Sequence, residues 1–100
     1  MQKIFFDPLE ILYSPHYQSH VFPNDFEKEK QKYLYRHVIL PHKSKENLRT
    51  LRDFSRNWVD KNILLTEEQC KQMGIQQSEG WEHYAYFTPE PFVLLFRKKF

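Results

Sequence analysis

The hydrophobic and polar residues of this chain follow two different periods, and each period predicts a type of element. Residues 33–40 are rich in aromatic and β-branched side chains, which favours a β-strand. In residues 43–58 the apolar positions recur every three or four residues, so this segment is predicted to form an amphipathic helix. The positions that set this period are Leu48, Leu51, Phe54 and Trp58. We expect Trp58 to pack against the core.

A second helix is predicted from its end signals. Thr66 is followed three residues later by Gln69, which is the pattern of a capping box at a helix start. Gly74 stands where helices commonly end in a left-handed residue. These two signals predict a short helix from about Glu67 to Met73.

Three further segments are predicted to be strands. Residues 11–17 are short and aromatic, and Pro15 makes them an edge or irregular strand because proline donates no hydrogen bond to a neighbour. Residues 81–87 and 92–98 are joined by Thr88-Pro89-Glu90-Pro91. The order strand, strand, helix, helix, strand, strand predicts an α+β domain, with a single four-stranded antiparallel sheet and two short helices on one side.

The length of the chain, 100 residues, suits one small core, so residues 1–100 are expected to form a single domain. Residues 1–10 have no clear periodicity and form an N-terminal extension in which Phe5 and Phe6 either dock on the domain or fray. Residues 18–32 hold a run of alternating charges and are expected to be a solvated, variable loop with room for a short helix.

Composition narrows the functional classes. The net charge of +2 is too small to indicate nucleic-acid binding by itself. Cys70 is the single cysteine, which excludes an internal disulfide and fits a reducing compartment. The sequence has neither an apolar run long enough to span a bilayer nor the pattern of a signal peptide. We therefore expect a protein of the nucleus and cytoplasm without a membrane partner.

Strand parity indicates a candidate anion site. Alternate strand residues share a face, so Arg36 lies with Leu34 and Val38, and Lys98 lies with Leu94 and Phe96. A cation on an otherwise apolar face needs a partner, and no carboxylate of matching parity lies nearby in the sequence. An external anion is one such partner, with Trp81, Ser78 and His16 completing the site. Pairing within the molecule or a position at the sheet edge is the alternative.

Metal binding and catalysis find less support. His16 and His20 are four residues apart, but they lie in a segment not predicted to be helical, and no third ligand is evident. Ser78 could act as a nucleophile and His83 as its base, but their spacing along a strand does not bring the two side chains together. His37 and His83 are expected to be hydrogen-bonded sheet histidines, and Cys70 an inert helix residue. The sequence therefore predicts no metal site, no cofactor and no enzyme.

Four motifs, in this order, resemble the Cks proteins, the small regulatory subunits of cyclin-dependent kinases. They are YSPHY at 13–17, YRHVILP at 35–41, MGIQQSEGWEHY at 73–84 and PEPFVLLFR at 89–97. The resemblance implies a non-catalytic adaptor in cell-cycle control, with a four-stranded antiparallel sheet and two short helices. One surface of such an adaptor binds the kinase, and a separate pocket binds phosphothreonine, so that the kinase is tethered to substrates already phosphorylated.

The resemblance also implies roles for individual residues. The phosphate-binding residues are His16, Arg36, Gln77, Ser78, Trp81 and Lys98. The kinase-binding residues are Tyr17, Ile39, Tyr84, Tyr86, Phe87, Thr88 and Glu90. The hinge is formed by Pro89, Glu90 and Pro91, and exchange of the last strand about it implies a monomer with a minor, strand-exchanged homodimer. Family members usually carry lysine or arginine where this chain has His16.

Two other readings of the residues stay open at this point. One is a stand-alone module that binds phosphopeptides or anions without a kinase partner. The other is a small nucleic-acid binder that uses Arg97-Lys98-Lys99 and exposed aromatic side chains.

Overall fold

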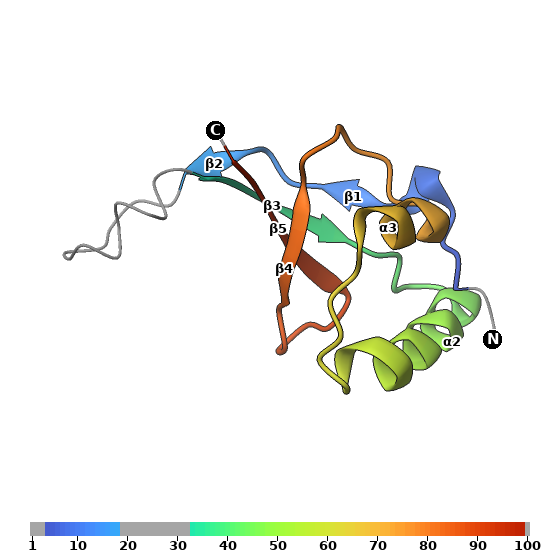
Figure 1. The fold of residues 1–100 in the computed structure, drawn as a ribbon. Helices are drawn as coiled ribbons and strands as arrows, with labels where there is room; N and C mark the ends of the chain where they lie inside the picture. The colour runs from blue at the N-terminus through green and yellow to red at the C-terminus, as the bar shows by residue number, and fades with distance from the viewer. Residues whose placement is uncertain (1–3, 19–32, 100) are drawn as a thin grey trace.

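The computed structural model describes residues 4–18 and 33–99, and its strands form one antiparallel sheet. The strands are β1 (Leu12–Tyr13), β2 (Tyr17–Gln18), β3 (Tyr33–Ile39), β4 (Glu82–Tyr86) and β5 (Val93–Lys99). The sheet order is β1-β3-β5-β4, and β2 also pairs with β3 (Figure 1). Because β5 pairs along the whole of β3, β1 and β2 share the other edge of β3. Together β1 and β2 occupy one position in the sheet, which is therefore four strands wide. The predicted four-stranded α+β fold is confirmed.

The strand predicted over residues 11–17 is interrupted as its proline indicated. Between β1 and β2, the backbone N–H of Ser14 donates to the carbonyl of His37 at 2.9 Å. The N–H of His37 in turn donates to Ser14 Oγ at 2.7 Å, so a side chain completes the ladder where Pro15 follows. Residues 19–32, which make up most of the loop expected at 18–32, lie outside the described residues.

Both predicted helices are present. Helix α2 (Lys45–Phe54) starts at Ser44, whose side chain accepts the N–H of Asn47, and continues into a π-helical turn, η2 (Ser55–Val59). The buried residues of α2 are Leu51 and Phe54, and Trp58 of η2 packs partly against the core as expected. Leu48 differs from the predicted buried stripe and is 52% exposed, because the first turn of α2 contributes no buried residue.

Helix α3 (Glu67–Met73) begins and ends as predicted. The Thr66 and Gln69 side chains exchange hydrogen bonds with each other's backbone N–H at 2.8 and 3.1 Å, which is the expected capping box. Gly74 follows with a φ of 106°, in the left-handed region. A Cβ at Gly74 would lie 2.3 Å from the carbonyl oxygen of Phe6, so both the conformation and the space require glycine.

The described part of the N-terminal extension docks on the domain mainly through Phe6, and Ile4 packs partly against the core beside it. Phe6 is 1% exposed, and its N–H donates to the carbonyl of Met73 at 2.9 Å. Phe5 points outward and is 54% exposed. A 3₁₀ turn, η1 (Pro8–Glu10), follows, and the Asp7 side chain caps its start by accepting the N–H of Leu9. The pattern of apolar residues did not predict this turn. The extension therefore ties the end of α3 to the start of the sheet.

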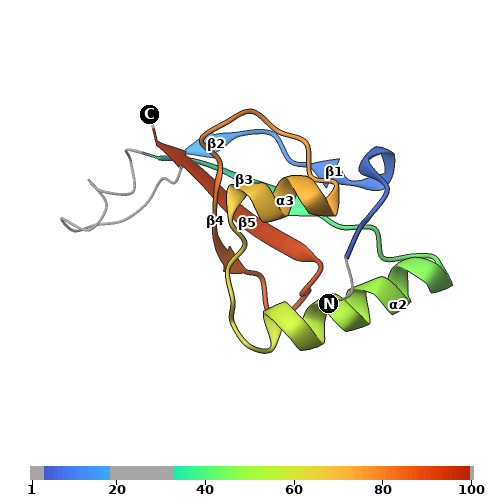
Figure 2. The ribbon, with the colours of Figure 1, turned by 45° about the vertical axis from the view of Figure 1, so that its right-hand side comes forward.

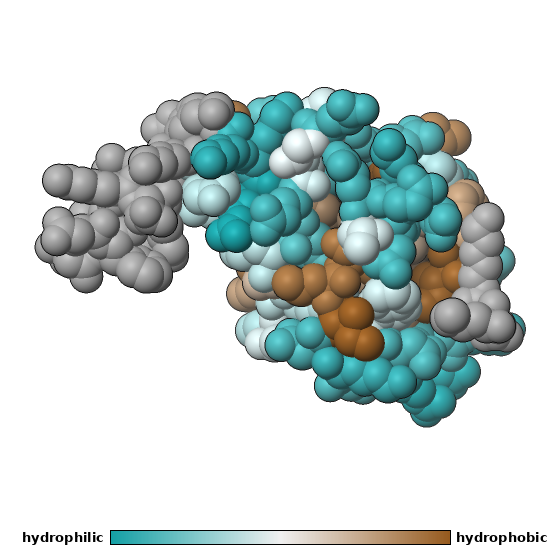
Figure 3. Space-filling view, viewed as in Figure 1, coloured by the Kyte–Doolittle hydropathy of each residue, from teal (hydrophilic) through white to brown (hydrophobic). Residues whose placement is uncertain are grey.

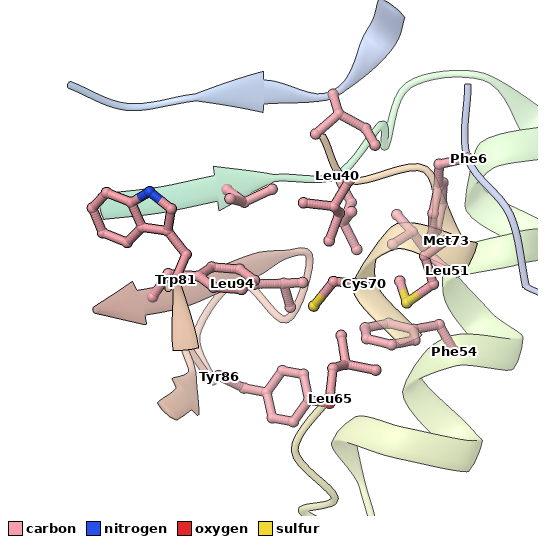
Figure 4. Packing of buried hydrophobic residues seen from close by; sticks show 14 residues of the cluster. Phe6, Leu40, Leu51, Phe54, Leu65, Cys70, Met73, Trp81, Tyr86 and Leu94 are labelled. Atoms are coloured by element: carbon pink, nitrogen blue, oxygen red, sulfur yellow. The ribbon is translucent and has the colours of Figure 1, made fainter. Parts of the chain in front are cut away.

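The core lies between one face of the sheet and the two helices, which Figures 1 and 2 show on the same side. Val38 of β3 and Leu94 and Phe96 of β5 are fully buried. Leu51 and Phe54 of α2 meet them together with Cys70 and Met73 of α3 (Figure 4). We call this side of the sheet the helix face and the other side the open face.

Candidate functional site

The strand register places Arg36 and Lys98 on the helix face. Arg36 lies opposite Phe96, and Lys98 lies opposite Leu34, two residues farther along β5. Residues related in this diagonal way on one face have Cα atoms about 7–8 Å apart, within reach of long side chains. The two cations therefore extend from neighbouring strands beyond the end of the apolar core, as strand parity predicted.

Trp81 lies between these cations. The Arg36 Cζ atom is 5.0 Å from the centroid of the Trp81 ring, and Lys98 Nζ is 6.0 Å from it. The ring of His16 packs against the indole with a centroid distance of 4.8 Å. Trp81 is itself 3% exposed and lies at the end of the core cluster, away from α2 (Figure 4). Its indole joins the core to a positively charged surface.

The segment between α3 and β4 adds the uncharged groups. Lys98 Nζ donates to Ser78 Oγ at 3.4 Å. Three buried polar atoms in this part of the chain have no hydrogen-bond partner among the described residues: Arg36 Nε, Gln77 Oε1 and Trp81 Nε1. Buried polar groups are normally paired, and unpaired ones mark places where a ligand or water completes the bonding. Two of the three are donors, which suits an acceptor such as an oxyanion.

Arg36 has no carboxylate partner among the described residues. Its Nη2 donates to the Ser14 carbonyl at 3.3 Å, and its Cζ lies 5.4 Å from the centroid of the Tyr13 ring. Burial lowers the pKa of Arg36 from its ordinary value, and Tyr13 opposes this shift. A partly desolvated guanidinium is favourable only with a compensating charge or hydrogen bonds, and a bound anion supplies both.

Of the six residues predicted to bind phosphate, contacts around Trp81 connect His16, Arg36, Ser78 and Lys98, and Gln77 precedes Ser78 in the chain. We call this set the candidate anion site. It offers a forked donor group, a primary amine, a hydroxyl and an indole N–H, a combination that suits a tetrahedral oxyanion.

The arrangement offers no nucleophile with a base. His83 is 3% exposed, and its Nδ1 accepts the backbone N–H of Leu65 at 2.9 Å, so it serves the fold. Burial raises the pKa of the Cys70 thiol to about 12, which keeps it protonated and unreactive. Among the described residues, no group of three metal-ligating side chains comes together, and no helix has the length and apolar character needed to cross a bilayer.

Sequence reasoning missed two residues beside the candidate anion site. Tyr13 Oη accepts the N–H of Gln76 at 2.7 Å, and Glu67 Oε1 accepts the N–H of Gly80 at 3.0 Å. Tyr13 lies opposite Val38 and thus on the same face as Arg36, so strand parity held a signal for it. Glu67 was predicted only as the start of a short helix, and its contact joins residues 13 positions apart.

Three of the residues predicted to bind a kinase lie on the open face. Tyr17 is 39% exposed, Ile39 is half-buried, and the ring of Tyr84 meets that of Tyr35 edge-on at 5.8 Å. Burial, with Tyr17 and Tyr35 nearby, raises the pKa of Tyr84 to about 12. Tyr17 and Tyr84 give this surface its aromatic rings, and the Tyr84 hydroxyl stays protonated at physiological pH.

The remaining predicted kinase-binding residues lie in or near the connection between β4 and β5. Phe87 is 40% exposed, and Thr88 and Glu90 are exposed. Tyr86 differs from the others in its placement: this side chain is 8% exposed and packs edge-on against Phe54 in the core, and its role in kinase binding stays a prediction. Its hydroxyl donates to the carbonyl of Ile63, so Tyr86 belongs to the helix face.

A groove of about 790 Å³ lies apart from both sets of residues, between the helices. Trp58, Ile63, Leu65 and Met73 form its apolar part, and polar residues such as Asp53 and Lys61 complete its lining. Ile63 and Leu64, in the connection from α2 to α3, are 43% and 44% exposed. Brown apolar surface gathers at this connection in Figure 3.

Comparison with known proteins gives a consistent result. A family model described as "Cyclin-dependent kinase regulatory subunit" matches residues 11–100. A cyclin-dependent kinases regulatory subunit of Dictyostelium discoideum is 42% identical over 85 residues, covering 85% of this chain and 82% of the relative. One of Patella vulgata is 39% identical over 84 residues, with coverage of 84% and 87%. A probable one of Physarum polycephalum is 44% identical over 68 residues, with 68% of each chain covered.

Proposed function

Because the chain belongs to the family of cyclin-dependent kinase regulatory subunits, which are non-catalytic, it acts as a kinase-associated adaptor, and we propose that it also binds phosphothreonine. The phosphate occupies the candidate anion site, and the kinase occupies the open face and the connection between β4 and β5. Through both contacts, the adaptor tethers a kinase to proteins that already carry a phosphothreonine.

The observation that carries this proposal is the set of cationic and donor groups around Trp81. Arg36 and Lys98 bring two positive charges to one indole, and Arg36 Nε and Trp81 Nε1 are buried donors without a partner among the described residues. A phosphothreonine carries nearly two negative charges at neutral pH and has three acceptor oxygens. It therefore matches the site in charge and in hydrogen bonding, whereas a single carboxylate offers fewer acceptors.

The open face supports the kinase half of the proposal. Tyr17, Ile39 and Tyr84 present aromatic and aliphatic surface there, and Glu90 adds a negative charge at the end of the sheet. Interfaces between proteins favour such aromatic surface at their centre and charges at their rim. The kinase and the phosphate then lie on opposite sides of β3 and β5, so one does not exclude the other.

The test is calorimetric titration with a short phosphothreonine peptide and its unphosphorylated twin. The wild type should bind only the phosphorylated peptide. Arg36→Gln should weaken binding at least ~10-fold, since a charge-assisted hydrogen bond contributes about 1.5–3 kcal/mol. Arg97→Gln is the matched control because Arg97 lies on the open face, paired with Glu82 at 3.0 Å. It makes the same change of charge and should keep affinity within ~2-fold, since charges screened by salt contribute little.

Equal losses in the two variants would show that the peptide responds to the net charge of the protein, and the proposal would fail. Binding of both peptides with equal affinity would also contradict it.

A further inference from the structure

The segment that carries Gln77 and Ser78, residues 75–81, has no helix or strand of its own. Figure 1 shows it as the arch that leads from α3 to β4. Two side chains outside the segment hold its backbone. Tyr13 Oη accepts the N–H of Gln76 at 2.7 Å, and Glu67 Oε1 accepts the N–H of Gly80 at 3.0 Å. Ser78 is midway between these two fixed positions.

Both of these side chains come from well-anchored elements. Tyr13 belongs to β1 and lies opposite Val38 in the sheet, and Glu67 opens α3, directly after the capping box. The segment is thus fixed to the sheet at one end and to the helix at the other. A site whose backbone is free to move binds its ligand more weakly, because binding then includes the entropy cost of ordering that backbone.

The hydrogen bond from the Gly80 N–H to Glu67 also sets how closely the segment approaches Lys98. Gly80 has a φ of 97°, and a Cβ built there would lie 3.2 Å from Lys98 Cε. The backbone of the segment therefore touches the stem of the lysine whose Nζ bonds Ser78 at 3.4 Å. Glu67 fixes the residue at this contact, one position before Trp81.

The charge of Glu67 works against the same site. A carboxylate in this neighbourhood repels a phosphate, so any favourable effect of Glu67 on anion binding must come from the hydrogen bond that it accepts. Glutamine keeps the acceptor oxygen and removes the charge, whereas alanine removes both. Comparison of the two substitutions therefore separates geometry from charge.

We propose that Glu67 and Tyr13 are positioning residues that hold the 75–81 segment so that Ser78 faces Lys98 in the candidate anion site. This inference rests on the proposed binding of phosphothreonine. Neither residue needs to touch the phosphate. Each acts through the backbone N–H that its side chain holds in place.

The experiment titrates the phosphothreonine peptide into Glu67→Gln and Glu67→Ala. Glu67→Gln should bind at least as tightly as the wild type, and Glu67→Ala should bind ~5-fold to ~10-fold more weakly than Glu67→Gln, the range that one hydrogen bond supports. Glu68, the next residue in the same helical turn, is exposed and is the matched control. Glu68→Gln and Glu68→Ala should agree within ~2-fold. Tyr13→Phe, which keeps the ring beside Arg36, should weaken binding as Glu67→Ala does.

A second arm separates positioning from general stability. In a Ser78→Ala background, the difference between Glu67→Ala and Glu67→Gln should shrink below ~2-fold, because the residue being positioned is gone. Amide hydrogen exchange of Gly80 should accelerate in Glu67→Ala and stay slow in Glu67→Gln. A difference that persists without Ser78, or unchanged exchange at Gly80, would overturn the positioning role.

The outcomes also distinguish this inference from the function on which it rests. A wild type that binds no phosphorylated peptide overturns both. A wild type that binds the peptide and loses it in Arg36→Gln, while Glu67→Ala and Glu67→Gln bind equally, overturns the positioning role alone.

Discussion

His83 is an ionisable side chain inside the core, and its surroundings keep it neutral. Its ring packs edge-on against Tyr86 at 4.5 Å and lies 5.3 Å from the ring of Phe96. The Nδ1 atom already accepts the N–H of Leu65, so protonation there would break a buried hydrogen bond. Burial lowers the pKa of His83 from 6.5 to about 4. The unfolded chain therefore binds a proton at this residue more readily than the folded chain does.

This difference predicts how stability depends on pH. The stabilisation that neutral His83 contributes is complete above pH 6.5 and is lost as the pH falls toward about 4. The loss should approach about 3 kcal/mol in the free energy of unfolding, since each pKa unit corresponds to about 1.4 kcal/mol. Urea unfolding between these pH values measures it. His83→Asn, which keeps an acceptor for Leu65 but does not titrate, should lower stability overall and flatten this slope.

The control for this measurement is His37→Asn. His37 is half-buried and shares a hydrogen bond of 3.1 Å with the hydroxyl of the exposed Tyr17. Its replacement should leave the slope below pH 6.5 in place. A slope that is the same in His83→Asn and the wild type would mean that other groups cause the loss of stability in acid.

At the level of residues, the sequence predicted neighbours in one strand pair better than contacts across the fold. Arg36 and Lys98 were placed on one face because alternate strand residues share a face, and the register bears this out. His16 and Trp81 were expected to complete the same site, but no local pattern indicated the contact between their rings, because it joins residues far apart in the chain. The bond from Gly80 to Glu67 depends on how the segment after α3 folds back, which no local pattern encodes.

The elements themselves were predictable where local chemistry decides them. The capping box and Gly74 fixed both ends of α3, because each end needs partners for backbone groups that the helix leaves unpaired. In β4, a bulge that was not predicted lies between His83 and Ala85. The extra residue shifts the alternation, so Tyr84 faces the open side and Tyr86 faces the core. Nothing in the residue types of β4 signals this bulge.

The connection between β4 and β5 is the element for which strand exchange is predicted. Here the two strands pair within one chain, and the connection folds tightly, with Glu90 N–H donating to the Phe87 carbonyl at 3.0 Å. Pro89 and Pro91 stiffen this turn, and the φ that each proline fixes suits an extended connection as well as a turn. Because β5 lies between β3 and β4, its exchange between two chains would rebuild the same pairs in a dimer.

We therefore expect a monomer with a minor, slowly formed dimer. Light scattering after long incubation at high protein concentration should detect the dimer, and Pro91→Ala should lower its fraction by relaxing the turn. Only monomer in the wild type, or an undiminished dimer in Pro91→Ala, would contradict strand exchange about this hinge.

On the scale of the whole molecule, the sheet separates two proposed surfaces. Arg36 of β3 and Lys98 of β5 extend from the helix face, whereas Tyr17 of β2 and Tyr84 of β4 lie on the open face of the same sheet. Substitutions that are distant and share no partner have additive effects. The two binding activities should therefore be separable by single changes.

The prediction compares Glu90→Gln with Arg36→Gln in two assays. Glu90→Gln should weaken capture of a cyclin-dependent kinase and leave titration with the phosphothreonine peptide within ~2-fold of the wild type, whereas Arg36→Gln should do the reverse. The double variant should show the sum of the two losses. Equal loss of both activities in either folded single variant would show that the two surfaces are coupled.

The position of Trp81 has a further consequence. Its indole is 3% exposed, and two cations flank it at 5.0 and 6.0 Å. The fluorescence of an indole shifts in colour and intensity with the electric field across its ring, and a neighbouring dianion would change that field sharply. Trp58, the other tryptophan, lines the groove between the helices and emits as a steady background. The adaptor thus contains its own optical reporter, whose signal would follow occupation of the anion site in real time without any attached dye.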